Sequence, residues 1–95
     1  MVRIGVVGYG YWGPTLVRNF VETPGAEIAA VADLDTNKLA TVKRRFPAVH
    51  TTTNFNDLLS DPSIDAVALA TPVNTHYELA MAALKAGKHV WVKSR

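Results

Sequence analysis

Five short segments of strand character alternate with segments of helical periodicity along the whole of this 95-residue chain. Four of them are mainly apolar and cover residues 3–8, 27–33, 64–71 and 88–92, and the weaker third segment, "AVHT", covers residues 48–51. Helices are expected from about Pro14, over residues 36–46 and 54–60, and from Thr75 to the glycine at position 87. Strands that alternate with helices are typical of a parallel sheet with helices on both faces. We therefore expect an α/β fold with an open parallel sheet of about five strands.

The last expected helix carries signals at both of its ends. Thr75 and Glu78 stand at the spacing of a capping box, in which each side chain bonds a backbone N–H of the first turn. Gly87 stands where a left-handed cap would end the helix. The side chains expected to face the core are Tyr77, Ala80, Met81 and Leu84.

Composition excludes several classes of function. Hydrophobic residues make up 48% of the chain, which predicts a packed core. The net charge of +2 is too small to indicate a nucleic-acid or anionic-membrane partner. The absence of cysteine excludes disulfides, thiolate metal sites and cysteine nucleophiles. No apolar window approaches the roughly 20 residues of a membrane span, and the start lacks a signal-peptide cleavage site. We expect a soluble, cytoplasmic protein without a metal site.

The stretch "GYGYWG" holds three glycines, Gly8, Gly10 and Gly13, in a G-x-G-x-x-G spacing between an expected strand and an expected helix. In a dinucleotide site, the first glycine permits the tight turn, the second lets a pyrophosphate approach the backbone, and the third lets the helix pack on the sheet. Tyr11 and Trp12 are expected to pack at the mouth of the site. The alternative is a tight turn that binds no ligand.

Asp33 lies twenty residues beyond the last of these glycines, at the end of the second apolar run. An acid there accepts hydrogen bonds from the adenosine ribose and repels a 2′-phosphate, so NAD is favoured over NADP. Leu34 is assigned to the same site. Asp35 either adds negative charge or caps the second helix, and Lys38 leaves binding of NADP open.

The segment "ATPVNTH" follows the fourth expected strand. In open parallel sheets, ligands bind outside the carboxyl ends of strands where the strand order reverses. Thr71, Pro72 and Asn74 are therefore expected to line the dinucleotide, although a loop and a helix cap explain them as well. His76 is either a functional group near the nicotinamide or a partly exposed helix residue. The predicted fold is a three-layer Rossmann fold with strand order 3-2-1-4-5. The residues expected to bind the cofactor are Gly8, Gly10, Tyr11, Trp12, Gly13, Asp33, Leu34, Thr71, Pro72, Asn74 and His76.

Three stretches, "IGVVGYGYWGP", "VADLD" and "IDAVALATPVNTHYELAMAALKAGKHV", make the chain resemble the N-terminal domain of the Gfo/Idh/MocA oxidoreductases. "GYGYWGPTLVRNF" is also similar to members that act on nucleotide-linked sugars. The resemblance implies hydride transfer between a nicotinamide cofactor and a hydroxyl-bearing carbon of a sugar, nucleotide sugar or cyclitol. The alternative is a non-catalytic nucleotide-binding or interaction module that has the fold without the chemistry.

The chain departs from the family pattern after "GKHV". The family continues with two more strand residues and then Glu-Lys-Pro, where this chain has Lys93, Ser94 and Arg95. Ser94 takes the position of the lysine that commonly serves near the reacting hydroxyl, so no catalytic residue is assigned. Lys93 stands one position early and is a weak candidate. The resemblance implies that residues 1–95 are a truncated dinucleotide-binding domain that lacks the sixth strand and the substrate domain. Alone, it is not expected to be catalytically competent.

This interpretation leaves the fifth strand at an edge of the sheet. Such a strand exposes unpaired backbone groups together with Val90, Trp91 and Val92. We therefore expect self-association through the fifth strand or poor solubility.

Overall fold

The computed structural model describes residues 1–8, 13–70 and 73–92, with the side chains at positions 13–14 and 73–76 left out. The elements in chain order are β1 (Val2–Val7), α1 (Gly13–Val21), β2 (Ala26–Ala32), α2 (Thr36–Arg45), β3 (His50–Thr52), α3 (Asn56–Leu59), β4 (Ala66–Leu69), α4 (Val73–Lys85) and β5 (His89–Val92).

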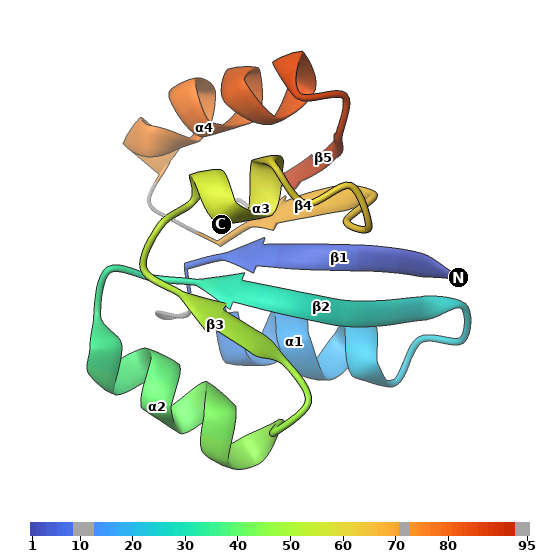
Figure 1. Ribbon diagram of the computed structural model, residues 1–95, viewed down its shortest axis with the longest axis vertical. Helices are drawn as coiled ribbons and strands as arrows, with labels where there is room; N and C mark the ends of the chain where they lie inside the picture. The colour runs from blue at the N-terminus through green and yellow to red at the C-terminus, as the bar shows by residue number, and fades with distance from the viewer. Residues whose placement is uncertain (9–12, 71–72, 93–95) are drawn as a thin grey trace.

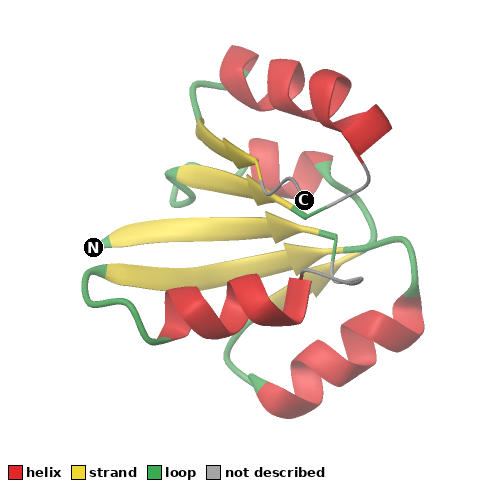
Figure 2. Cartoon of the chain, turned by 180° about the vertical axis from the view of Figure 1, so that it is seen from behind, coloured by secondary structure: helices red, strands yellow, loops and turns green. Residues whose placement is uncertain are grey.

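The five strands form one parallel sheet in the order β3-β2-β1-β4-β5, which confirms the predicted Rossmann topology. Helices α1 and α2 cover one face, and α3 and α4 cover the other (Figures 1 and 2). The carboxyl ends of the strands lie along the same edge of the sheet (Figure 1). The strand order reverses between β1 and β4, so these two carboxyl ends flank the point where such sheets bind ligands.

The core has two halves, one on each face of the sheet. Val6 and Val31 point toward α1 and α2, whereas Val67 and Leu69 point toward α3 and α4. All four side chains are fully buried. Among the described residues, no helix is long and apolar enough to cross a membrane.

Helix α3 approaches the sheet closely because β1 has a glycine beneath it. A Cβ atom on Gly5 would lie 2.1 Å from Cδ2 of Leu58, whose side chain is fully buried. The absence of a side chain at Gly5 therefore fixes how near α3 sits to β1.

The predicted start of α4 is wrong. The helix begins at Val73, so Thr75 lies inside its first turn and is not the N-cap of a capping box. The predicted end is confirmed: Gly87 has a φ of 81°, its N–H donates to Leu84 O (3.0 Å), and Lys88 N–H donates to Ala83 O (3.0 Å). These two bonds form a Schellman motif.

The predicted core face of α4 is also wrong for three of its four residues. Ala83 is fully buried and Leu79 and Ala80 are partly buried against the sheet, whereas Tyr77, Met81 and Leu84 are exposed. This helix is apolar on most of its circumference, so periodicity alone allowed two rotations of the helix about its axis. The observed one places small alanines against the sheet, which lets the helix backbone approach closely.

Lys88, directly after the Schellman glycine, is a buried lysine. Its Nζ donates to the carbonyl oxygens of Asp61 (2.7 Å) and Ile64 (2.7 Å) in the turn that precedes β4. In the same turn, hydrogen bonds from the hydroxyl and the backbone N–H of Ser63 hold the pKa of the Asp61 carboxyl below its usual value. Together these contacts fix the entry to β4.

Candidate functional site

Gly8, directly after β1, has the backbone conformation that the first glycine of the motif was expected to provide. Gly8 has a φ of 88°, a left-handed conformation that favours glycine, and its N–H donates to Ala32 O (2.7 Å) at the end of β2. Gly13 is the first residue of α1, so the amino end of this nine-residue helix lies at the same edge of the sheet. The first N–H groups of a helix lack partners within it and favour anions. Gly10, Tyr11 and Trp12 lie outside the described residues.

Asp33 follows β2 at the same edge. Its N–H donates to Thr52 O (3.1 Å), and its carboxylate Oδ1 accepts a hydrogen bond from Asp35 N–H (2.8 Å). The Asp33 side chain is partly exposed, and the neighbouring Leu34 side chain is 88% exposed. Both predicted site residues thus stand at the carboxyl end of the strand beside β1, where a ligand can reach them.

The structure shows that Asp35 caps α2. Its carboxylate Oδ1 accepts from Asn37 N–H (2.9 Å), and its backbone has the extended conformation of an N-cap. The charge of Asp35 still lies two residues from Asp33. Lys38 is exposed in the first turn of the same helix.

The other half of the predicted site falls mainly outside the described part of the chain. Asn74 and His76 lie in the first turn of α4, but their side chains are not described, and neither are Thr71 and Pro72. The same holds for the family's catalytic position at residues 93–95. Ala70, the last described residue before this half, donates its N–H to Val7 O (2.8 Å). Ala70 is therefore held beside the carboxyl end of β1.

Sequence reasoning missed Thr52, which supports Asp33. Its carbonyl oxygen accepts the hydrogen bond from Asp33 N–H. Its hydroxyl Oγ1 accepts a hydrogen bond from Asn54 N–H (3.0 Å) and donates one to the carboxylate of Asp57. No local signal marks this residue, because its role depends on the β2–β3 register that places it opposite Ala32. In the part of the chain that the structure describes, no cluster of acidic or histidine side chains is arranged to hold a metal ion.

Known proteins share this fold over nearly the whole chain. A family model described as "Oxidoreductase family, NAD-binding Rossmann fold" matches residues 2–93. The uncharacterised oxidoreductase YdgJ of Escherichia coli is 41% identical over 92 residues, which cover 96% of this chain and 26% of that protein. The myo-inositol 2-dehydrogenase of Thermotoga maritima is 33% identical over 90 residues, which cover 95% of this chain and 27% of that enzyme.

Solved structures include the scyllo-inositol dehydrogenase of Lactobacillus casei with bound NAD(H) and scyllo-inositol. It is similar with a TM-score of 0.89 and 28% identity, over 97% of this chain and 27% of that one. The chain thus spans about a quarter of the length of the relatives that it matches.

Proposed function

Because this chain belongs to the Gfo/Idh/MocA family of oxidoreductases, whose model matches residues 2–93, we propose that it binds a nicotinamide dinucleotide at the carboxyl edge of its sheet. One observation carries the proposal. The left-handed turn at Gly8, the amino end of α1 and the carboxylate of Asp33 meet at the ends of the adjacent strands β1 and β2. The likeness to an enzyme with bound NAD(H) supports the same proposal.

In this proposal each half of the cofactor meets a different part of the edge. The pyrophosphate binds at the turn from Gly8 to Gly13, where helix N–H groups favour negative charge. The adenosine ribose binds the Asp33 carboxylate, and the exposed Leu34 side chain covers an apolar face of the adenine. The nicotinamide lies toward the start of α4, beside Asn74 and His76. Gly10, Tyr11, Trp12, Thr71 and Pro72 complete the proposed site.

We propose that NAD is preferred over NADP. A 2′-phosphate would lie next to the carboxylate of Asp33 and within reach of the charge of Asp35, and like charges disfavour each other most where water is partly excluded. The hydrogen bond from Asp35 N–H to Oδ1 of Asp33 holds the carboxylate at the end of the strand.

At the level of the whole enzyme, we propose an oxidoreductase that acts on a hydroxyl-bearing carbon of a sugar, nucleotide sugar or cyclitol. The bound cofactor supplies the chemistry by accepting or donating a hydride. In this proposal the residues named above bind and orient it, and no catalytic residue is assigned among them. The inositol dehydrogenases among its relatives support this substrate class.

We also propose that the chain self-associates through β5. This strand pairs with β4 on one side, and no described strand pairs with its other side. Such an edge offers a row of backbone donors and acceptors to a second chain.

Titration with NADH tests cofactor binding directly. We expect saturable enhancement of NADH fluorescence by the wild-type chain and a dissociation constant (Kd) raised roughly 10-fold or more by Asp33→Ala, because a charge-assisted hydrogen bond is lost. Gly10→Val is expected to abolish the signal. Glu22→Ala removes a carboxylate just beyond the far end of α1 and serves as the matched control. An unchanged signal for all variants, or none at millimolar NADH, would contradict the proposal.

Cofactor preference is tested with two conservative variants. Asp33→Asn and Asp35→Asn each remove one charge, and asparagine at position 35 still caps α2. We expect the ratio of the Kd for NADPH to that for NADH to exceed one in the wild type. It should fall most in Asp33→Asn and less in Asp35→Asn. A wild type that binds NADPH more tightly would refute the preference while leaving dinucleotide binding intact.

A further inference from the structure

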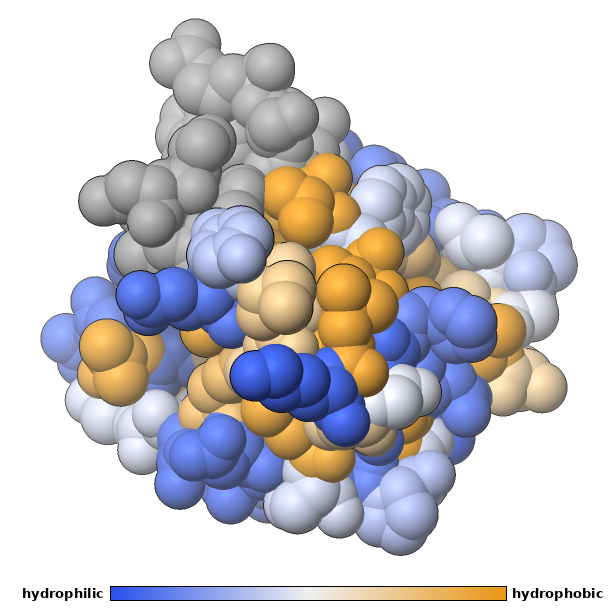
Figure 3. Space-filling model, turned by 90° about the horizontal axis from the view of Figure 1, so that it is seen from above, coloured by the Kyte–Doolittle hydropathy of each residue, from blue (hydrophilic) through white to orange (hydrophobic). Residues whose placement is uncertain are grey.

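A network of polar side chains lies where β3 ends, beside the proposed ribose site. On the face seen from the α4 side, by contrast, apolar side chains gather between charged ones (Figure 3). The hydroxyl of Thr52, the last residue of β3, accepts from Asn54 N–H (3.0 Å) and donates to the carboxylate of Asp57 in the first turn of α3. Asn54 Oδ1 in turn accepts from Asn56 N–H (2.9 Å). These bonds join the end of β3 to the start of α3.

The network reaches Asp33 through the backbone. Thr52 stands opposite Ala32 in the parallel pairing of β2 with β3, and its carbonyl oxygen accepts the hydrogen bond from Asp33 N–H (3.1 Å). Asp33 is therefore held from two directions, at its N–H by Thr52 and at its carboxylate Oδ1 by the N–H of Asp35 (2.8 Å). The direction of the carboxylate depends on where both of these neighbouring segments lie.

The two ends of β3 are held in different ways. The strand has three residues, all paired with β2, and none of them is buried. At its amino end, Val49 is buried, and the Val49 carbonyl oxygen accepts from Nζ of Lys43 (2.9 Å). At its carboxyl end, the hydroxyl of Thr52 makes the contact with α3. Segments that bury few apolar side chains open at low cost, so this contact decides how firmly the carboxyl end of β3 is held.

Helix α3 gives this contact a fixed point. Leu58 directly follows Asp57, is fully buried, and lies against Gly5 of β1, where a side chain would not fit. The N–H of Asp57 donates to Asn54 O (3.0 Å). The carboxylate of Asp57 thus projects from backbone that the core holds in place, although the residue itself is exposed.

We propose that Thr52 and Asp57 are positioning residues for the Asp33 carboxylate, and that their hydrogen bond raises the affinity for the dinucleotide without contacting it. The inference rests on the proposed binding of the ribose by Asp33. A hydrogen bond to a ligand weakens steeply when its acceptor is poorly placed, so residues that hold the acceptor contribute to binding through geometry. Helix α3, which packs on one face of the sheet, thereby influences the ligand edge.

Variants that keep or lose the hydroxyl test the proposal by NADH titration. Thr52→Val keeps the branched shape of threonine and removes the hydroxyl, and it is expected to raise the Kd for NADH roughly fivefold. Thr52→Ser keeps the hydroxyl and should stay within about twofold of the wild type. If the residue served packing alone, valine would be the milder of the two changes.

The partner residue gives a second pair of variants. Asp57→Ala removes the acceptor of the Thr52 hydroxyl and should raise the Kd for NADH by the same roughly fivefold factor. Asp57→Asn keeps an amide oxygen that accepts from the hydroxyl, so its Kd should remain within about twofold of the wild type. Asp57 is exposed, so this pair keeps the test decisive if Thr52→Val folds poorly.

A double-mutant cycle with Asp33→Ala shows whether the effect passes through Asp33. In that background Thr52→Val should change the Kd by less than about twofold, because the residue that it positions is absent. Amide hydrogen exchange gives a readout that needs no ligand. The Asp33 N–H, which donates to Thr52 O, should exchange at least roughly threefold faster in Thr52→Val than in the wild type.

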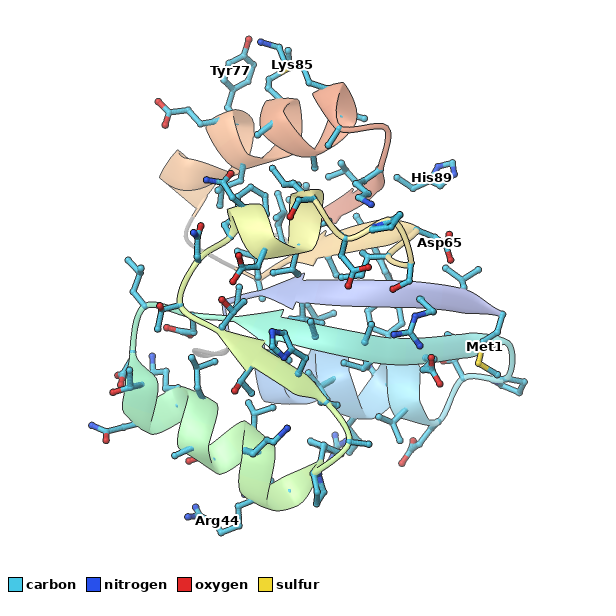
Figure 4. All side chains as sticks on the ribbon, in the orientation of Figure 1. Met1, Arg44, Asp65, Tyr77, Lys85 and His89 are labelled. Carbon is cyan, nitrogen blue, oxygen red and sulfur yellow. The ribbon has the colours of Figure 1, made fainter. Side chains whose placement is uncertain are left out.

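Ser63→Ala is the matched control, since it removes a hydroxyl that donates to the carboxylate of Asp61 (2.7 Å) in the turn before β4. This turn lies at the opposite edge of the sheet, the edge where Figure 4 shows Asp65 and Met1. The control should change neither the Kd for NADH nor the exchange of the Asp33 N–H.

Each alternative outcome has a distinct meaning. Equal Kd values for the wild type, Thr52→Val and Asp57→Ala overturn the positioning role, as does a Thr52→Ser variant that binds as weakly as Thr52→Val. A weakening by Thr52→Val that persists in the Asp33→Ala background also overturns it. If Asp33→Ala itself binds NADH as tightly as the wild type, the proposed ribose contact fails together with the positioning role. Failure of the Thr52 and Asp57 variants alone leaves that contact standing.

Discussion

Replacing Gly5 with alanine is expected to lower the free energy of unfolding by about 2–3 kcal/mol, as overpacking of a filled core does. The new Cβ would lie 2.1 Å from Cδ2 and 3.1 Å from Cγ of Leu58, and it would also approach Cδ1 of Ile64 at 3.6 Å. Leu58 is fully buried, so its side chain has no space into which it can turn. Urea denaturation followed by circular dichroism measures the change. The cost is a large fraction of the roughly 5–15 kcal/mol that stabilises a typical domain.

A double-mutant cycle separates this clash from a general effect on β1. Leu58→Val removes the terminal methyl groups that the alanine would meet. We expect Gly5→Ala to cost at least about 1 kcal/mol less in that background, because contacting residues couple by this order. Equal costs in both backgrounds would show that α3 does not depend on the glycine.

Replacing Lys88 with methionine is expected to lower the free energy of unfolding by about 2–4 kcal/mol. The ammonium group makes two hydrogen bonds to carbonyl oxygens, and its removal takes this donor from Ile64 O and leaves Asp61 O with only the longer bond from Ile64 N–H (3.2 Å). Methionine keeps most of the apolar stem, so the loss reports on the ammonium group more than on packing. Thermal and urea denaturation check the prediction.

Lys38→Met is the matched control, because Lys38 is exposed in the first turn of α2. It should change the free energy of unfolding by less than about 0.5 kcal/mol, as surface substitutions do. Equal losses in the two variants would show that the buried ammonium contributes no special stability.

The order of the sheet could be predicted from the sequence because four of the five strands are short apolar runs separated by segments expected to be helical; β3, with the sequence HTT, is the exception. Boundaries were less accurate: the third strand runs from His50 to Thr52 rather than over 48–51. The inward face of α4 could not be predicted because alanine and larger apolar residues alternate around it. The helix expected over 54–60 begins later, with Phe55 as the N-cap of α3, although Asn54 Oδ1 accepts a hydrogen bond from Asn56 N–H (2.9 Å).

The site was predictable where it depends on local pattern and not where it depends on contacts between distant segments. The position of Gly8 and that of Asp33 follow from a glycine after one strand and an acid after the next. Thr52 and Lys88 carry no such mark, since one acts through strand register and the other through a turn 24–27 residues earlier in the chain. For Asp35 the sequence left two roles open, because helix capping and ligand contact both favour an aspartate.

The central place of β1 has a consequence for how the chain acquires its structure. Strand β1 is paired on one side by β2 and on the other by β4, whose first residue comes about sixty positions later. Its backbone groups and apolar side chains therefore remain without their partners on one side until β4 has been synthesised. Long-range parallel pairing of this kind slows folding. The nascent chain therefore exposes the unpaired backbone groups and apolar side chains of β1 until the fourth strand has been synthesised.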